Sequence, residues 1–378
     1  MNTRLAALAL ATAALAACEP NPSVTGPAAA LQAARDADIS AALSDPGAVY
    51  TLTNQVGGNA VAVFARGADG RLTAAGTVST GGTGTGASLG SQSAVTLSDD
   101  GRWLFAVNAG SNDVSVFSVS PAGLALASRT ASGGTLPISL TGHGNVLYVL
   151  NAGGTGNISG FAVGTSGALT AIAGATLPLS GSSVGPAQVS FSPDDRHLVV
   201  TEKNTNQLDV YAVDANGVAT GPTTTASAGG TPFGFSFGHR NELFVSEAAG
   251  SASSYELDAT GSVSLVSGAV LTHQGAPCWA VVTTDGRIGF TGNGAGSVSA
   301  FTIAPDGAIS LGDANGGTAL IGAGINDIAL SHNSRYLYVL QTGGAQAIHA
   351  FRVEADGHLT PLGAIAGLPN GTRGLTAF

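Results

Sequence analysis

One short turn sequence recurs seven times along the chain, and this repeat constrains the fold more than any other feature. Each copy places a glycine behind a run of alternating apolar and polar residues. These glycines stand 44 to 53 residues apart, at positions 70, 123, 167, 217, 261, 307 and 357. Four of them follow Asp or Asn, and such pairs suit tight hairpins because both central residues can take positive φ. The spacing predicts seven copies of one β-structured unit.

Each unit contains the strands of a four-stranded sheet. An alternating segment such as 114–119 precedes the turn, and a more continuous apolar segment such as 104–107 lies before that. A further strand stands upstream, as at 187–191, and is followed by a turn of the Ser-Pro-Asp type. Four strands in each of seven units of about 47 residues describe an all-β fold, the seven-bladed β-propeller. A β-helix is the alternative, but it would need shorter and more regular coils.

The two ends of residues 48–378 complement each other. The first unit begins at its second strand, at 48–52, and the chain ends after a first strand, at 373–378. Pairing of the N- and C-terminal strands would close the ring and remove the open sheet edges that invite aggregation. We therefore expect one closed propeller over 48–378, and we expect it to be a monomer.

The first residues predict export and a lipid anchor. A short basic start is followed by an apolar run at 5–17, which is long enough for a signal peptide and too short to span a bilayer. The run ends in Leu-Ala-Ala-Cys at 15–18, which resembles the bacterial lipobox, so we expect cleavage after residue 17 and lipidation of Cys18. A plain secretory leader is the alternative. Residues 18–47 then form a flexible tether, and the chain lies in the bacterial cell envelope, at the periplasmic face or outer membrane.

Composition excludes some partners. The net charge is −10 and the chain has one lysine, Lys203, which argues against nucleic acid because phosphate binding needs clustered cations. The membrane is expected to be contacted through the lipid anchor only. With Cys18 lipidated, Cys278 is the one remaining thiol, so no disulfide within the chain is possible. The seven histidines show no short metal-ligand spacing, and neither a metal nor a cofactor is predicted.

The repeat resembles the lactonase-family propellers, which include 6-phosphogluconolactonase and the carboxymuconate-lactonizing enzyme. The resemblance rests on Gly-Pro-x-x-hydrophobic-x-Phe-Ser-Pro-Asp at 185–194, Leu-Tyr-Val-x-Asn at 147–151, Val-x-Val-Phe-x-Val at 114–119 and Gly-x-Leu-Thr at 70–73. It covers the chain from about residue 48 to the C-terminus. The repeat is specific for the fold, whereas related propellers share it without a known reaction.

The resemblance implies a catalytic Arg-His pair at the start of one inner strand and a Glu at the end of the next. Here Glu202 is retained, but Ala187 and Gln188 stand where the family has Arg and His. Arg supplies fixed positive charge for an oxyanion, and His supplies a pKa near neutrality. Ala187 offers neither and Gln188 offers only hydrogen bonds, so Glu202 would act as a lone catalytic base if burial raised its pKa.

Starts of first strands and ends of second strands lie on one face of a propeller, its mouth. This places a set of polar side chains there, with one tryptophan, as candidate ligand-binding residues: Asn54, Asn108, Asn151, Gln188, Glu247, Trp279, Asn326, Asp327, Gln341 and Arg373. The amides form either a polar funnel for a ligand or hydrogen bonds to the backbone of neighbouring turns. Trp279 either stacks on a sugar or packs beside Cys278, and Arg373 either clamps a carboxylate or pairs with Asp327 or Glu247.

We expect the mouth to bind a small sugar-like or carboxylated molecule, or an envelope protein, without the family's original catalysis. The alternative is a lactone hydrolase or isomerase with a rearranged site that uses Glu202. A scaffold that docks partners through the long loop at 80–90 is a third alternative. A Ca²⁺ ion held by Asp327, Glu202 and Glu247 is a minor alternative, since hard cations prefer several oxygen ligands.

Overall fold

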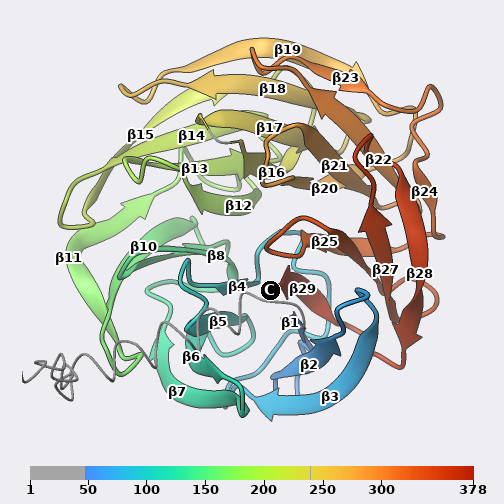
Figure 1. The fold of residues 1–378 in the computed structure, drawn as a ribbon. Coiled ribbons are helices and arrows are strands. Elements are labelled where there is room, and N and C mark those ends of the chain that lie inside the picture. The colour runs from blue at the N-terminus through green and yellow to red at the C-terminus, as the bar shows by residue number, and fades with distance from the viewer. Residues whose placement is uncertain (1–46, 239) are drawn as a thin grey trace, which may run out of the picture. The chain divides into compact units, whose positions relative to one another are not determined.

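A computed structural model describes residues 47–238 and 240–378. The signal peptide at 1–17, the lipidated Cys18 and nearly all of the tether fall outside these residues and stay predictions. In the described part, seven antiparallel sheets are arranged around a common centre, which confirms the seven-bladed propeller (Figure 1). No helix among the described residues is long and apolar enough to cross a membrane.

We number the sheets as blades 1 to 7, each ordered from its inner to its outer strand. Blade 1 contains β29 (Arg373–Ala377), β1 (Gly47–Leu52), β2 (Ala60–Arg66) and β3 (Leu72–Ser79). Blade 2 contains β4 (Val95–Leu97), β5 (Trp103–Asn108), β6 (Asp113–Ser120) and β7 (Gly123–Ala131), and blade 3 contains β8 (Pro137–His143), β9 (Val146–Asn151), β10 (Asn157–Val163) and β11 (Leu169–Pro178). Blade 4 contains β12 (Pro186–Phe191), β13 (His197–Glu202), β14 (Gln207–Val213) and β15 (Ala219–Ala226).

The remaining three blades follow the same order. Blade 5 contains β16 (Pro232–Phe237), β17 (Glu242–Glu247), β18 (Ser251–Leu257) and β19 (Val263–Leu271). Blade 6 contains β20 (Pro277–Val282), β21 (Ile288–Asn293), β22 (Ser297–Ile303), β23 (Ile309–Leu311) and β24 (Ala319–Leu320). Blade 7 contains β25 (Ile325–Leu330), β26 (Tyr336–Gln341), β27 (Ala347–Val353) and β28 (Leu359–Ala366).

The two terminal strands pair as expected. In blade 1, β29 lies antiparallel to β1, with Val49 opposite Ala377. The Thr51 hydroxyl donates to the Gly374 carbonyl, and Arg66 Nε donates to the Phe378 carbonyl at 3.1 Å. The first and last strands of the described chain therefore share one blade, and the ring is closed by hydrogen bonds between its ends.

The recurrent glycines form the turns between third and fourth strands, as their spacing predicts. All seven have positive φ, from 77° at Gly217 to 106° at Gly123. The residue before each glycine does not, which differs from the expectation that both central residues take positive φ. In the first turn the Gly70 amide donates to the Gly67 carbonyl at 2.9 Å. The turn is therefore of type I with glycine in the following left-handed position, which needs only one residue of positive φ.

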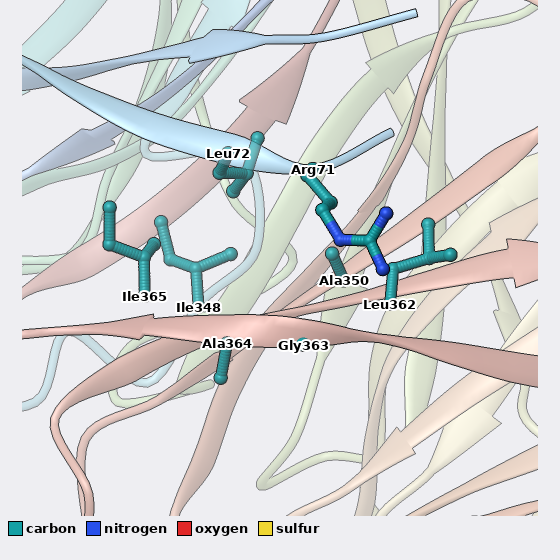
Figure 2. Close-up of a pocket in the computed structure, with 8 residues that line it drawn as sticks. All are labelled: Arg71, Leu72, Ile348, Ala350, Leu362, Gly363, Ala364 and Ile365. Atoms are coloured by element: carbon teal, nitrogen blue, oxygen red, sulfur yellow. The ribbon is translucent and has the colours of Figure 1, made fainter. Parts of the chain in front are cut away.

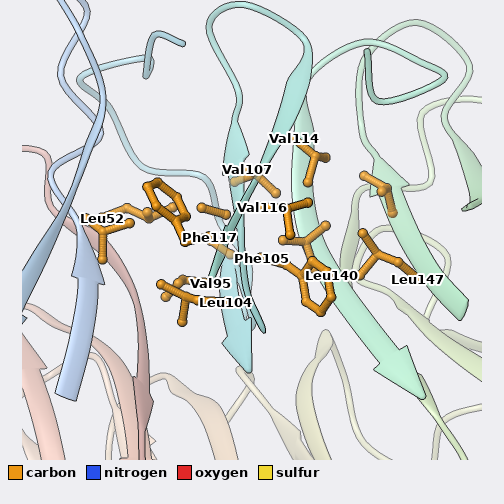
Figure 3. Packing of buried hydrophobic residues seen from close by; sticks show 14 of the residues in the cluster. Leu52, Val95, Leu104, Phe105, Val107, Val114, Val116, Phe117, Leu140 and Leu147 are labelled. Carbon is orange, nitrogen blue, oxygen red and sulfur yellow. The ribbon is translucent and has the colours of Figure 1, made fainter. Parts of the chain in front are cut away.

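Apolar side chains between neighbouring blades form the core. Second strands are buried along their length, whereas the outer strands are largely exposed. Figure 3 shows one cluster that joins blades 1 to 3, in which Phe105 of blade 2 lies beside Leu140 of blade 3. Complete burial of such side chains contributes about 1.5–3 kcal/mol each. Packing between blades therefore holds the inner strands, and the site that they carry, in fixed positions.

Two blades depart from the simple four-strand pattern. The outer position of blade 6 is divided between β23 and β24, because the segment between them turns away at Asp313, whose carboxylate accepts a hydrogen bond from Thr318 at 2.6 Å. In blade 2 the inner strand is short and starts at Val95. Ser93 has a φ of 64°, so the chain turns there before it enters the sheet.

Candidate functional site

The starts of first strands and the ends of second strands lie side by side, as expected. Pro186 pairs with Glu202 in blade 4, and Pro277 pairs with Asn293 in blade 6. We call this side of the ring the mouth face and the side with the glycine turns the opposite face. The mouth face is where the sequence predicts a ligand site.

The amide side chains at the ends of the second strands are buried and bound to their own loops. Asn54, Asn108, Asn151 and Gln341 are at most 4 % exposed. The Asn54 amide donates to the carbonyls of Ala87 and Gly371, at 2.9 and 3.1 Å. The other three likewise bind nearby loop carbonyls or side chains. The geometry therefore agrees with the alternative in which these amides hold the turns, since buried backbone groups need such partners.

In blades 2, 5 and 6 the third strand supplies a hydrogen-bond partner for the polar side chain at the end of the second. Three residues into β6, β10, β18 and β22 stands a serine, at 115, 159, 253 and 299. In blade 6, for example, Asn293 donates to the Ser299 hydroxyl at 2.8 Å. In blade 5 the Glu247 carboxylate accepts from Ser253 at 2.7 Å and also from Ser227, Ser251 and the Gly229 amide. Glu247 is thus a fully satisfied structural carboxylate.

Blade 4 breaks this pattern with two carboxylates. Asp209 takes the place of the serine and faces Glu202, and both side chains are fully buried. The Ser180 amide donates to both carboxylates, at 3.1 and 3.2 Å, and Glu202 also accepts from the hydroxyls of Ser180 and Thr205 at 2.6 Å. Burial, together with the hydrogen bond and negative charge of Glu202, raises the pKa of Asp209 far above its usual range. The pair therefore holds a proton at neutral pH.

The positions of the family's Arg and His are closed. Ala187 is fully buried, and Gln188 is 4 % exposed. The Gln188 amide donates to the Phe235 carbonyl at 3.0 Å and accepts from the Phe235 amide at 2.8 Å. Both polar atoms of Gln188 are thus used to join blade 4 to blade 5, which leaves none for a ligand.

A segment of the chain itself crosses the mouth, which no sequence pattern indicated. We call residues 86–93 the strap. Gln92 donates to the Ala280 carbonyl at 2.8 Å and accepts from the Ala280 amide at 2.9 Å, although blades 2 and 6 are not neighbours in the ring. The backbone N–H of Gln92 also donates to the Ala187 carbonyl of blade 4 at 3.2 Å. The strap therefore lies over the centre of the ring and is fastened to several blades.

Trp279 belongs to this closure. It is 6 % exposed, its Nε1 donates to the Ser91 carbonyl at 3.1 Å, and its ring meets the Phe233 ring edge-on at 5.5 Å. The geometry agrees with packing rather than with a free stacking face. Cys278 is buried next to it, and burial raises the pKa of its thiol to about 12. Cys278 therefore behaves as a small apolar side chain at neutral pH.

Asp327, Asn326 and Arg373 lie at the starts of the inner strands of blades 7 and 1. Asp327 is 1 % exposed, and its carboxylate accepts from the Ile328 and Leu375 amides at 2.9 and 3.0 Å. Desolvation by burial raises its pKa well above the usual range. Asn326 binds the Thr342 hydroxyl at 2.6 Å.

Among the described residues Arg373 pairs with no carboxylate, which counts against the alternative in which it pairs with Asp327 or Glu247. Its Nη1 donates to the Thr342 hydroxyl at 2.9 Å and to the Thr372 carbonyl at 2.6 Å. Its Nε is buried and has no partner among the described residues. The residue as a whole is partly exposed, and it contributes positive charge to the mouth.

Sequence reasoning also missed Lys203, although its being the only lysine in the chain was a usable signal. Its ammonium donates to the carbonyls of Gly90 in the strap and Pro186, and lies 4.9 Å from the centre of the Phe233 ring. Burial lowers its pKa to about 8. The side chain is nevertheless partly exposed.

Charge is distributed unequally between the two faces. In the described chain, the loops that join strands on the mouth face contain one charged residue, Lys203. Turns of the opposite face carry many, including the exposed pairs Arg71–Asp69 and Arg102–Asp100. The carboxylates on the mouth side are at most 8 % exposed, namely Asp113, Glu202, Asp209, Glu247 and Asp327. The charge that a ligand meets at the centre of the mouth is therefore positive, from Lys203 and Arg373.

Three cavities of the described chain lie away from the mouth centre. A crevice of 110 Å³ lies between β3 and the third and fourth strands of blade 7, β27 and β28, with Arg71 at its edge (Figure 2). Cavities of 610 and 190 Å³ adjoin His197 on the opposite face. In the described residues no group of three or more His, Cys, Asp or Glu is placed to hold a metal ion. Glu202, Glu247 and Asp327 are thus not brought together as ligands for a calcium ion.

Comparisons with known proteins agree with the fold. Residues 48–178 match the family model described as "Lactonase, 7-bladed beta-propeller". A comparison with curated proteins gives no match. A putative 6-phosphogluconolactonase from Bacteroides fragilis aligns with a TM-score of 0.69 at 18% identity, over 87% of this chain and 97% of that one. A periplasmic gluconolactonase from Pseudomonas aeruginosa aligns with a TM-score of 0.67 at 17% identity, over 87% and 98%. At these identities the structural likeness concerns the fold. The resemblance seen in the repeats is thereby confirmed over residues 48–178, and the fold is the seven-bladed β-propeller that this family model describes.

Proposed function

We propose that the protein binds a small carboxylated molecule at the mouth of the propeller, without the lactone chemistry of its family. One observation carries the proposal: the accessible charges at the mouth centre are two cations, Lys203 and Arg373, while the carboxylates there are buried. Arg373 is partly exposed and pairs with no carboxylate among the described residues, and a guanidinium recognises a carboxylate through parallel hydrogen bonds. A carboxylated ligand would supply the anion that both side chains lack.

The filled positions of the family's Arg and His support binding over hydrolysis. Ring opening needs a group that stabilises the oxyanion and a group that moves a proton. Ala187 supplies neither, and both polar atoms of Gln188 are held by Phe235. The strap adds a fixed cover over the centre through Gln92 and Ser91. The closed mouth therefore favours a rim that recognises a ligand over a pocket that processes one.

The proposed place of this function is the bacterial cell envelope. It rests on the lipobox-like sequence at 15–18, which lies outside the described residues. An envelope protein that offers a carboxylate to the same cations is the alternative partner, and it would compete with the small molecule.

Fluorescence of Trp279 tests the proposal, because its indole is bound to the strap. Trp103, the other tryptophan, is replaced by Phe so that the signal has one source. We expect gluconate or glucuronate to change the emission saturably and neutral glucose to leave it unchanged. Arg373→Gln should weaken binding about tenfold or more, since a hydrogen bond to a charged group contributes about 1.5–3 kcal/mol.

Arg71→Gln is the matched control, because Arg71 is an exposed arginine on the opposite face. It should leave the titration unchanged. A response to glucose equal to that with the sugar acids, or a response that Arg373→Gln does not weaken, would contradict carboxylate recognition at the mouth.

Lactone hydrolysis is the second candidate, and the Glu202–Asp209 pair is the observation that favours it. A buried carboxyl that holds a proton at neutral pH is suited to act as a general acid, and its neighbour as a base. The proteins with this fold include ones described as 6-phosphogluconolactonase and gluconolactonase. Release of protons from a sugar lactone, abolished by Glu202→Ala, would support this candidate over pure binding.

A further inference from the structure

Lys203 differs from the other charged residues of the chain in its type and in its location. It is the only lysine and the only charged residue in the described loops of the mouth face. It follows Glu202 directly at the end of β13, where the second strand of blade 4 reaches the mouth. Its Nζ lies between the strap and the start of β12, bound to the carbonyls of Gly90 and Pro186.

The surroundings of this amine contain no anion to hold its charge. Within the described part of the chain, Nζ interacts with two carbonyls and the face of the Phe233 ring, and with no carboxylate. The oxygens of Glu202 are occupied by Ser180 and Thr205. The thiol of Cys278, which interacts electrostatically with Nζ, is neutral at neutral pH because burial raises its pKa.

A desolvated lysine without a counter-ion is a good nucleophile, because a larger share of it is the neutral amine. Burial lowers the pKa of Lys203 to about 8, against an ordinary value of about 10.4. The side chain stays partly exposed at the mouth face, and the contacts of its Nζ are with two carbonyls and an aromatic ring. The geometry therefore combines partial exposure of the side chain with a desolvated amine.

We propose that Lys203 is a covalent site that captures a small carbonyl compound as an imine. The neutral Nζ attacks the carbonyl carbon, a nitrogen–carbon bond forms, and a proton moves from nitrogen to oxygen to give a carbinolamine. A molecule of water then leaves, with the second nitrogen proton, and a carbon–nitrogen double bond remains. The step is reversible by addition of water and needs no oxidant or reductant.

The class of compound follows from the charge of the mouth. An aldehyde or 2-oxo acid that carries a carboxylate would be attracted by the positive charge of the mouth, to which Arg373 contributes from blade 1. This part of the inference rests on the proposed function, whereas imine formation rests on Lys203 alone. Glyoxylate is the smallest probe that combines both groups, glycolate carries the carboxylate without the carbonyl, and propionaldehyde carries the carbonyl without the carboxylate.

The full chain is treated with each probe and cyanoborohydride, which reduces an imine to a stable secondary amine. Peptide mass mapping separates an adduct on Lys203 from one on the N-terminal amine. The control is the double variant Lys203→Arg/Arg71→Lys, which moves the only lysine to an exposed position of the opposite face. Both proteins carry one lysine, so their rates compare directly.

We expect glyoxylate to modify Lys203 at pH 7.5 about tenfold or more faster than the exposed control lysine, with half of the maximal rate reached near pH 8. Propionaldehyde should show a smaller ratio between the two proteins, and glycolate should give no adduct. A rate at Lys203 no greater than at the control lysine would overturn the imine site. Equal ratios for glyoxylate and propionaldehyde would overturn the carboxylate preference.

These outcomes are separable from failure of the proposed function. Saturable binding of glycolate or gluconate, seen by Trp279 fluorescence, would support carboxylate recognition even if no adduct formed on Lys203. A Lys203 adduct that forms without any carboxylate binding would support the covalent site and count against the proposed function.

Discussion

Replacement of Asp209 by Ser should reduce the loss of stability that the folded chain suffers as pH rises. The native chain loses this stability because Asp209 in blade 4 must ionise. Asp209 is fully buried against Glu202, and its pKa in the folded chain is raised above the ordinary value of 3.8. Between the two pKa values the folded state binds a proton that the unfolded state has released. Stability therefore falls as pH rises through this window, by about 1.4 kcal/mol per pH unit for one proton.

From pH 5 to pH 7 this single proton is worth about 3 kcal/mol. Serine removes the titrating group, and it fits because serines at 115, 159, 253 and 299 occupy the same place in four other blades. We therefore expect Asp209→Ser to gain about 3 kcal/mol relative to the native chain between these two pH values. Other buried acids such as Asp327 titrate equally in both proteins, so their effects cancel.

Urea denaturation at pH 5, 6 and 7, followed by fluorescence, measures the difference. Asp209→Asn serves as a second variant that keeps the size of the side chain and removes the ionisation. If the pH dependence of the unfolding free energy is the same for the native chain and both variants, then Asp209 does not hold a proton in the folded state, and the reasoning from burial is refuted.

Three further predictions concern single contacts. Cys278 should resist thiol reagents at pH 8 in the folded chain and react after unfolding, because burial raises its pKa to about 12; native modification, located by peptide mass mapping, would contradict this. Gly84→Ala should destabilise the loop before the strap by about 1–3 kcal/mol, because its Cβ would lie 2.2 Å from the Asn54 backbone carbon; an unchanged urea midpoint would count against that contact. Thr51→Val should lose about 1–3 kcal/mol, because the Gly374 carbonyl would lose its hydroxyl donor; Thr51→Ser should retain the stability, and equal losses in both variants would point to packing.

The fold could be predicted from the sequence because the turns, the strand pattern and the incomplete units at the two ends all indicate the same architecture. The seven glycines mark turns that require one residue of positive φ, and strands of alternating polarity fill the intervals between them. The incomplete units at 48–52 and 373–378 predict their own pairing, since a propeller leaves no inner strand unpaired. The register of the inner and second strands then placed the mouth residues on one face.

The sequence was less informative about whether the mouth residues are free to contact a ligand. Alignment of the repeats located Asn54, Asn108 and Asn151 at the mouth, but it could not tell a presented amide from one that is bound to a nearby turn. That distinction depends on loop backbone atoms whose positions no periodic pattern encodes. The hydrogen bonds of these amides support the structural alternative, whereas the roles predicted for them in ligand binding stay predictions.

The position of the strap and the surroundings of Lys203 could not be predicted from the sequence for a related reason. The segment 80–93 is rich in Gly, Thr and Ser and has no alternation, so nothing in it indicates that Gln92 reaches Ala280 in another blade. Lys203 belongs to no repeated position, and comparison between repeats discards such residues. The count of residue types identifies Lys203 as the one lysine of the chain, but it was used only to argue against nucleic acid as a partner.

Proton release in a pH-stat tests most directly whether the mouth binds without hydrolysing. The full chain is assayed with glucono-1,5-lactone beside Glu202→Ala, and gluconate binding to the same samples shows that the mouth is intact. If the mouth binds without hydrolysing, both proteins release protons at the uncatalysed rate. Release by the native chain well above that rate, and its loss in Glu202→Ala, would contradict the account and establish a lactonase with a rearranged site.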